Sequence, residues 1–513
     1  MKRKKFTSTY GAFRLWAVGI LTIGNIAATI TIIMLLAQLS PYIGWTFSAL
    51  ALIIVLRMTV RLRAPDHTLA WAIIMMLVPI LGVVLYFTWG RVSFSRNEKG
   101  YLERSMNNGR AFLSMEKDRF YELKQEDSRL ARQAAVLNRV GFPVYKGGSA
   151  EYFPLGELLF KRMLEDLEAA ERHIFIDYYI IAEGELWRNI FKILAQKASK
   201  GLDVRVLCDD FGCVKSLEKR FINELRENGI KIAIFNPIHR YLQQLYAIYR
   251  SHQKICVVDS EVAYVGGVNI ADEYINKNSR VGHWKDTGLR LTGGCVRSIT
   301  IEFLQMWDVV TENVEKDLRI FMSGDSDKNG DGYYVPFADG PANNPLNPAH
   351  DIYMTMCETA LESIWFTTPY LTPDCPLRET LIVAAHGGID VRIVTPGIPD
   401  YKPVYAATRG HYQQLLNAGV RIFEYTPGFM HAKMVLCDKK SAVIGSINMD
   451  SRSFYHQYEN AVWLAGSNAI DDMTADFEHI FAQCREIDAQ AWVRRPLLQR
   501  FIEAALCLMS PMF

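Results

Sequence analysis

The sequence predicts a duplicated α/β protein with mixed sheets and pseudo-twofold symmetry, preceded by N-terminal transmembrane helices. Three observations predict this class. The front of the chain has long charge-free stretches, the rest repeats one strand–helix–strand pattern, and each repeat carries the same polar motif. A chain of 513 residues exceeds one ordinary domain, so two or more folded units are expected. The net charge of +2 lacks the basic excess of nucleic-acid-binding proteins, so no nucleic-acid partner is expected.

Three apolar segments predict a transmembrane region over residues 1–90. Residues 15–39 carry no charge and, at about 1.5 Å per residue, form a helix longer than a bilayer core of about 30 Å. Residues 41–60 can span if Arg57 extends to the interface. Residues 68–89 are charge-free, with tryptophans near both ends as in an aromatic belt. A signal peptide and soluble core helices are the alternatives, but a signal peptide has an apolar region of only about 7–15 residues.

The side of the membrane is left open by two conflicting indications. Lys and Arg residues around the three segments are most numerous on the side of the N-terminus, which places the C-terminal part outside the cytoplasm. The nine cysteines show no disulfide or metal spacing, and such free thiols are commoner in reducing compartments.

After a polar, helical linker over 91–140, the chain predicts a first α/β domain at 141–330. The apolar stretch 173–181 predicts a strand, and a helix with one apolar face follows. That helix ends at a Lys-Gly pair, which is typical of a helix C-terminus. The stretch 202–210 predicts the next strand, and this order indicates α/β layering.

A second domain is predicted at 331–513 because the same pattern returns there. The stretch 363–373 and the stretch 387–396 flank a helix, as the two strands of the first domain do. "GLDVRVL" from Gly201 and "GIDVRIV" from Gly388 agree at Gly, Asp, Val and Arg. Two copies packed about a pseudo-twofold axis would bring their polar motifs to one interface.

Both domains contain the spacing His-x-Lys-x4-Asp, followed at the same offset by Gly-x-x-Asn. Residues two apart on a strand point to the same face, so each His and Lys would project side by side. One such motif occurs by chance in many proteins, but two copies inside a repeated unit indicate an active site. The predicted residues are His252, Lys254, Asp259 and Asn269 in the first copy, and His431, Lys433, Asp438 and Asn448 in the second.

Two such clusters suit phosphodiester chemistry. Two lysines and two asparagines would supply donors for the non-bridging oxygens of a phosphate. One imidazole can attack phosphorus while the other protonates the departing alkoxide, which gives a phosphohistidine intermediate. Water in the second step gives hydrolysis, and an alcohol gives a transferred phosphodiester. No cofactor and no metal is predicted for this chemistry.

Other polar residues are candidates for supporting roles. Asp286 and Glu459 are predicted to orient the imidazoles through the far ring nitrogen. Asp259 and Asp438 are counted with the catalytic motif, but their parity differs from that of the histidines, which favours a structural role at the strand ends. Ser446 is a candidate donor to phosphate, although its counterpart is a glycine.

The stretch "DSDKNGDG" at 325–332 matches the start of a calcium-binding loop. Its twelfth position, which needs a bidentate Glu, is Pro336. The stretch is therefore interpreted as a polar linker between the two domains.

The paired motifs, HxKxxxxD followed by G-[GS]-x-N, resemble those of the phospholipase D superfamily over about residues 145–513. Within it, the chain is similar to bacterial cardiolipin synthases in "WAIIMMLVPILGVVLYFTWG", "TTPYLTPD", "SINMDSRSF" and "WVRRPLLQRF". The apolar segment 15–39 is additional to the two-span front of that family.

The resemblance implies a multi-pass protein of the bacterial cell membrane that acts on phosphatidylglycerol in the lipid bilayer. It implies phosphatidyl transfer from one phosphatidylglycerol to another, with His252 as nucleophile and His431 as acid, or the reverse. A membrane-anchored hydrolase and a non-catalytic scaffold are the alternatives, and the oligomeric state is not predicted. The basic and apolar tail from Trp492 is predicted to lie on the bilayer surface, with packing against the second domain as the alternative.

Overall fold

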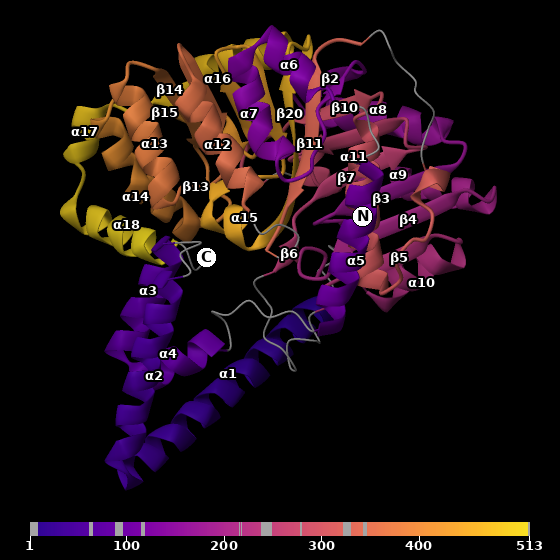
Figure 1. Ribbon diagram of the computed structural model, residues 1–513. Coiled ribbons are helices and arrows are strands. Elements are labelled where there is room, and N and C mark those ends of the chain that lie inside the picture. The colour runs from indigo at the N-terminus through magenta and orange to yellow at the C-terminus, as the bar shows by residue number, and fades with distance from the viewer. Residues whose placement is uncertain are drawn as a thin grey trace, which may run out of the picture.

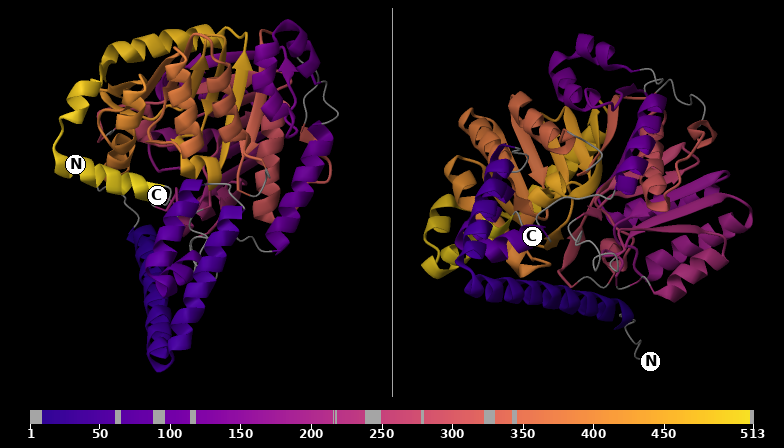
Figure 2. Two further views of the ribbon diagram at one scale, coloured as in Figure 1. Left: turned by 60° about the vertical axis from the view of Figure 1, so that its left-hand side comes forward. Right: turned by 60° about the horizontal axis from the view of Figure 1, so that its bottom comes forward.

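A computed structural model describes residues 9–60, 65–87, 96–113, 118–214, 216, 218–237, 249–277, 280–321, 330–341 and 346–510 (Figure 1). The described part contains two mixed sheets flanked by helices, with an apolar helical region projecting from one end (Figure 1, Figure 2). Most of the stretch interpreted as an interdomain linker, 325–332, lies outside the described residues.

The first sheet is mixed. Strands β3, β4 and β5 run parallel, and β7, β8, β10 and β2 continue from β3 in antiparallel pairs. In spatial order the strands are β2 (Ser149–Phe153), β10 (Gly288–Thr292), β8 (Val262–Gly266), β7 (Lys254–Val258), β3 (His173–Tyr178), β4 (Asp203–Asp209) and β5 (Lys231–Phe235).

The second sheet repeats this order and these directions, with one further strand at each end. In spatial order its strands are β1 (Tyr145–Lys146), β11 (Tyr333–Asp339), β20 (Gln457–Ala465), β18 (Ser441–Gly445), β17 (Met434–Cys437), β12 (Ser363–Thr367), β14 (Asp390–Pro396), β15 (Arg421–Tyr425) and β21 (Cys484–Glu486). The predicted duplication of a mixed-sheet α/β unit is therefore confirmed.

The sheets pack face to face, and both faces of each sheet are covered. On β7, Ile255 and Val257 enter a core shared by both sheets, whereas Cys256 and Val258 contact the helices outside. A strand buried on both faces is apolar at every position, which explains its continuous hydrophobic run. The outer helices of the first sheet are α8 (Gly156–Ala169), α9 (Glu185–Ser199) and α10 (Lys219–Glu227). The shared core also contains α11 (Val296–Thr311) and α16 (Ala469–Gln483).

Helices on the outer face of the second sheet come from two parts of the chain. Three follow its strands: α12 (Pro348–Thr359), α13 (Cys375–His386) and α14 (Lys402–Asn417). Two others, α6 (Phe120–Glu126) and α7 (Ser128–Asn138), lie within the predicted linker. Ala131, Ala134 and Leu137 of α7 are buried in the core of the second domain, because their spacing places them on one helix face. This part of the predicted linker is therefore an integral layer of the second domain, while α5 (Arg96–Leu113) packs on α11.

The N-terminal helices are α1 (Thr9–Leu39), α2 (Pro41–Val60), α3 (Pro65–Leu77) and α4 (Pro79–Leu85). Among the described residues, the helix over Tyr42–Val60 is long and apolar enough to cross a membrane. The segment 68–89, predicted as one span, is instead broken between α3 and α4, and residues 88 and 89 lie outside the described residues. Pro79 lacks the N–H that a continuous helix needs, and it disfavours helical backbone at the residue before it.

Candidate active site

The two predicted motifs occupy equivalent places in the two sheets. His252 lies between β6 (Arg250–Ser251) and β7, and Lys254 is the first residue of β7. His431 follows β16 (Gly428–Met430), and Lys433 immediately precedes β17. All four side chains are buried at the interface between the domains. Each His is within electrostatic reach of the other motif's Lys. The structure therefore brings the two motifs together in one site.

Two short parallel strand pairs cross between the domains and fix the histidines. β6 of the first domain pairs with the start of β20, and β16 of the second pairs with β9 (His283–Lys285). The backbone N–H of His252 donates to the Tyr458 carbonyl at 2.8 Å, and that of His431 donates to the Lys285 carbonyl at 2.7 Å. Each imidazole is consequently held by the backbone of the other domain.

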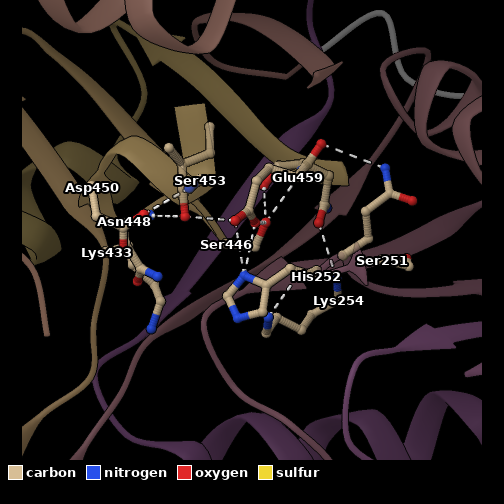
Figure 3. A network of polar contacts seen from close by, with 12 residues as sticks. Ser251, His252, Lys254, Lys433, Ser446, Asn448, Asp450, Ser453 and Glu459 are labelled. Atoms are coloured by element: carbon tan, nitrogen blue, oxygen red, sulfur yellow. Dashed lines mark hydrogen bonds and ion pairs between the residues drawn. The ribbon is translucent and has the colours of Figure 1, made fainter. Parts of the chain in front are cut away.

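The same crossing pairs each imidazole with a carboxylate of the opposite domain. His252 Nδ1 lies 2.9 Å from both carboxylate oxygens of Glu459, and His431 Nδ1 lies 2.5 Å from Asp286 Oδ2. Figure 3 shows the His252 ring with one nitrogen toward Glu459 and the second directed away from it. Because Nδ1 is engaged, Nε2 is left to face a substrate. The sequence predicted both carboxylates but not that they exchange partners between domains.

The two carboxylates are accommodated differently. A Cβ at Gly267 would collide with Asp286 Oδ1, so the glycine leaves room for this carboxylate beside His431. At the equivalent place in the second domain, the Ser446 hydroxyl donates to Glu459 Oε2. The Ser446 hydroxyl thus supports the orienting carboxylate, and its role as a donor to phosphate stays a prediction.

Each lysine folds back beside its own histidine. The Nζ of Lys254 donates to the His252 carbonyl, and the Nζ of Lys433 donates to the His431 carbonyl. Burial lowers the pKa of Lys254 to about 7, although Glu459 opposes the shift, and burial lowers the pKa of Lys433 to about 8 against the opposing charge of Asp286. An anionic ligand between them would favour the charged form of both lysines.

The surroundings of both histidines favour the neutral imidazole. Burial, followed by the charges of Lys254 and Lys433, holds the pKa of both imidazoles well below its ordinary value. A neutral imidazole keeps the lone pair that a nucleophile needs. Burial also raises the pKa of Asp286 to about 7 and that of Glu459 to about 8, while the lysines oppose both shifts.

The two predicted asparagines have different surroundings. The Asn269 side chain accepts from the Ile180 N–H at 3.1 Å and donates to the Tyr274 hydroxyl at 2.7 Å. The Asn448 Oδ1 is buried and has no hydrogen-bond partner among the described residues. The Asn448 Oδ1 therefore retains capacity to accept a hydrogen bond, whereas both ends of the Asn269 amide are engaged within the protein.

Asp259 and Asp438 lie just beyond the ends of β7 and β17 that are remote from the lysines. In the first domain this places Asp259 about 16 Å along the strand from Lys254. Asp259 accepts from the backbone N–H groups of residues 171, 172 and 173 at 2.7–2.8 Å. Asp438 does the same for residues 361, 362 and 363. These contacts fit the structural role that the sequence favoured and not membership of the catalytic set.

Sequence reasoning missed the aromatic rings around the imidazoles and a second hydroxyl on Glu459. The ring of Tyr179 lies 5.1 Å from that of His252, and the ring of Trp284 lies 5.2 Å from that of His431. Ser453 donates to Glu459 Oε1 at 2.7 Å. Trp284 and Ser453 stand in "HWKDTG" and "SINMDSRSF", next to predicted residues, but nothing in their spacing indicates these contacts.

Within the described residues, no group of His, Cys, Asp or Glu side chains is arranged to hold a metal ion. The duplicated sheets and the shared His-Lys site together define a two-domain protein of the phospholipase D-like class. A family model described as "Cardiolipin synthase, PLD-like domain" matches residues 163–287 and 353–481. A second, described as "Phospholipase_D-nuclease N-terminal", matches residues 46–91.

Similar proteins extend the match beyond these segments. A cardiolipin synthase of Geobacillus sp. is 34% identical, covering 88% of this chain and 89% of the relative. One of Halalkalibacterium halodurans is 31% identical, covering 91% and 95%. The solved phosphatidylserine synthase of Haemophilus influenzae is 13% identical, with a TM-score of 0.57, covering 74% of this chain and 98% of that one, and it shares the fold. The chain belongs to the cardiolipin synthase family of phospholipase D-like phosphatidyltransferases.

Proposed function

We propose that this chain transfers a phosphatidyl group from one phosphatidylglycerol to a second, giving cardiolipin and glycerol through a phosphohistidine on His252. The observation that carries the proposal is the convergence of two imidazoles, each oriented through Nδ1 by a carboxylate of the other domain. The ammonium groups of Lys254 and Lys433, which lie beside the two histidines, complement the phosphate charge.

In the first step, His252 Nε2 attacks phosphorus, and the bond between phosphorus and the glycerol headgroup oxygen breaks. His431, protonated once the phosphate anion is bound, gives its proton to that oxygen, and glycerol leaves. In the second step, a headgroup hydroxyl of another phosphatidylglycerol attacks phosphorus while His431 removes its proton. The phosphorus–nitrogen bond breaks and cardiolipin is released.

The surroundings of Glu459 favour His252 as the nucleophile. Its imidazole becomes positively charged when the phosphorus–nitrogen bond forms, so a carboxylate that stays ionised beside it stabilises the intermediate. Burial raises the pKa of Glu459 to about 8, but the charge of Lys254 and the hydroxyl hydrogen bonds from Ser446 and Ser453 favour its ionised form, and a positively charged phosphohistidine would favour it further. Asp286 accepts one backbone N–H, that of Thr287, at 2.9 Å.

The purified protein in phosphatidylglycerol vesicles tests the reaction. We expect cardiolipin and glycerol in equal amounts, whereas phosphatidic acid as the main product would make the protein a hydrolase. In a His431→Gln variant, a phosphatidyl adduct should accumulate and be found by mass spectrometry on His252. An adduct on His431 in the reciprocal His252→Gln variant, with none on His252, would reverse the two roles.

We further propose a multi-pass membrane protein in which α1 and α2 cross the bilayer and α3 and α4 pack beside them. The exposed apolar side chains of these helices support this, for example Ile23, Ile53 and Leu56. We assign residues 1–90 to the membrane region and 141–330 and 331–513 to the catalytic domains. Residues 118–140 then belong with the second domain, on whose core they pack.

A further inference from the structure

The last described helix, α18 (Leu497–Met509), exposes an unbroken apolar face. Leu497, Leu498 and Phe501 are 78%, 72% and 73% exposed. The other exposed residues of the helix are Ile502, Ala504, Ala505, Leu508 and Met509. These positions recur with helical spacing, so they form one continuous face, and none of them carries a charge. Exposing a continuous apolar face to water is unfavourable in free energy.

The polar side of α18 faces the protein. Glu503 is 3% exposed and binds Arg495 at 2.7 and 2.9 Å. A Cβ added at Gly410 of α14 would lie 2.8 Å from the Glu503 carbonyl oxygen, so the two helices pack closely. The orientation of α18 is thus fixed by a buried ion pair and a tight helix contact. Its apolar face is directed outward by that docking.

The position of α18 relates it to both the membrane region and the active site. In Figure 1 and Figure 2 it lies at the end of the globular part from which α1–α4 project. The neighbouring helix α14 is hydrogen-bonded to β13 (Leu371–Thr372). The Leu371 N–H donates to the Thr408 hydroxyl at 3.1 Å. β13 in turn pairs with β19 (Met449–Asp450), which immediately follows Asn448.

We propose that α18 lies in the surface of the lipid bilayer, with its apolar face among the acyl chains and its axis along the membrane plane. Amphipathic helices with basic flanks bind bilayers in this way, and Arg494 and Arg500 stand beside the apolar face. Through α14 and β13, the helix holds the Asn448 side of the site at the lipid surface. The inference rests on the proposed membrane location but not on the reaction catalysed.

Photo-crosslinking from α18 tests this contact directly. A benzophenone amino acid replaces Phe501 in the protein reconstituted in phosphatidylglycerol vesicles, and mass spectrometry finds what it labels. The matched control is Leu361, which is 69% exposed and lies just before β12, beside Asp438 and at the end of the strands remote from the lysines. We expect lipid adducts from position 501 and none from position 361. A crosslink from 501 to a second copy of the chain or to α1–α4, or no lipid adduct, overturns the proposal.

Activity gives a second readout. We expect the double variant Leu498→Ser, Phe501→Ser to lose activity severalfold on vesicles but to keep it on short-chain phosphatidylglycerol dispersed in detergent, where no bilayer is needed. The Leu361→Ser variant should match the parent in both assays. Equal vesicle activity in the double variant overturns the proposal. If the parent made no cardiolipin, the proposed reaction would fail while the crosslinking result still decided the membrane contact.

Discussion

At the residue scale, each imidazole of the site is paired through Nδ1 with a carboxylate that belongs to the other domain. Asp286 and Glu459 each follow the motif of their own domain in the chain, so nothing in the local spacing indicates that they exchange partners. The parallel pairing of β6 with β20 and of β16 with β9 exchanges them. That exchange depends on how the domains dock, which no spacing within one domain encodes. Ser446, predicted as a donor to phosphate, donates to Glu459 within its own domain, a contact that its spacing in the sequence does not indicate.

The exchange predicts which substitutions affect which histidine. Asp286→Asn and Glu459→Gln should each lower kcat on phosphatidylglycerol by about 10²–10⁴-fold, the usual contribution of a positioned acid or base. A phosphatidyl ester of 4-nitrophenol needs no proton on its leaving group. Asp286→Asn, which acts through the acid His431, should therefore recover most of its kcat/KM for release of 4-nitrophenol, which precedes the step where His431 acts as a base, and Glu459→Gln should not. Steady-state kinetics on both substrates measures the difference.

The control for these two variants is Glu478→Gln, because Glu478 is an exposed acid on α16 whose ion-pair partner is the exposed Lys439. It should leave both rates unchanged. Equal recovery by both variants, or recovery by Glu459→Gln alone, would contradict the assignment of His252 as nucleophile.

At the element scale, apolar runs predicted strands well and their ends less well. The stretch 202–210 contains β4 at Asp203–Asp209, as predicted. The stretch 363–373 divides into β12 and the separate strand β13, which pairs elsewhere, with β19. Where a strand leaves its sheet is decided by its neighbours, so an apolar run alone cannot show it. The break at Pro79 differs, because the proline itself signalled it within the segment interpreted as one span.

The turns that end β7 and β17 lead to a stability prediction. Asp259 and Ser260 both have positive φ, as do Asp438 and Lys439, in hairpin loops that leave three residues between the paired strand ends. Asp259 also accepts three backbone hydrogen bonds at the amino end of β3. Asp259→Asn keeps the turn preference but loses the charge, so it should destabilise the protein by about 1–3 kcal/mol. Thermal unfolding in detergent measures this loss.

Activity separates this structural role from a catalytic one. Asp259→Asn should keep the kcat of the parent at temperatures where it stays folded. Glu261→Gln, an exposed acid next to the same turn, should change stability by no more than about 0.5 kcal/mol. A drop in kcat of Asp259→Asn without a lower unfolding temperature would return Asp259 to the catalytic set.

At the scale of the whole molecule, duplication explains how the site becomes compact and buried. Each domain contributes a His, a Lys and an orienting carboxylate, and the shared core holds the two sheets face to face. The sequence predicted this arrangement from the repeated unit and its repeated motif. Bringing Lys254 and Lys433 together also adds a repulsion that neither domain has alone, and this repulsion lowers the pKa of Lys254 beyond the effect of burial.

The lowered pKa values of Lys254 and Lys433 predict the pH dependence of catalysis. With pKa values of about 7 for Lys254 and about 8 for Lys433, both lysines lose their protons in the free enzyme as the pH rises through this range. A phosphate anion binds their protonated forms, so kcat/KM should fall above about pH 7 to 8, because kcat/KM reports the free enzyme. The bound phosphate raises the pKa of both lysines, so kcat should stay level to higher pH.

The variant Lys433→Met tests whether the domains share this titration. Removing its charge takes away the repulsion that lowers the pKa of Lys254, so the fall of the residual kcat/KM should move to higher pH. If kcat/KM of the variant falls at the same pH as that of the parent, the charge of Lys433 does not influence the pKa of Lys254. A kcat/KM that rises with pH above about 8 in the parent would contradict binding by protonated lysines, since deprotonation can only weaken their attraction for phosphate.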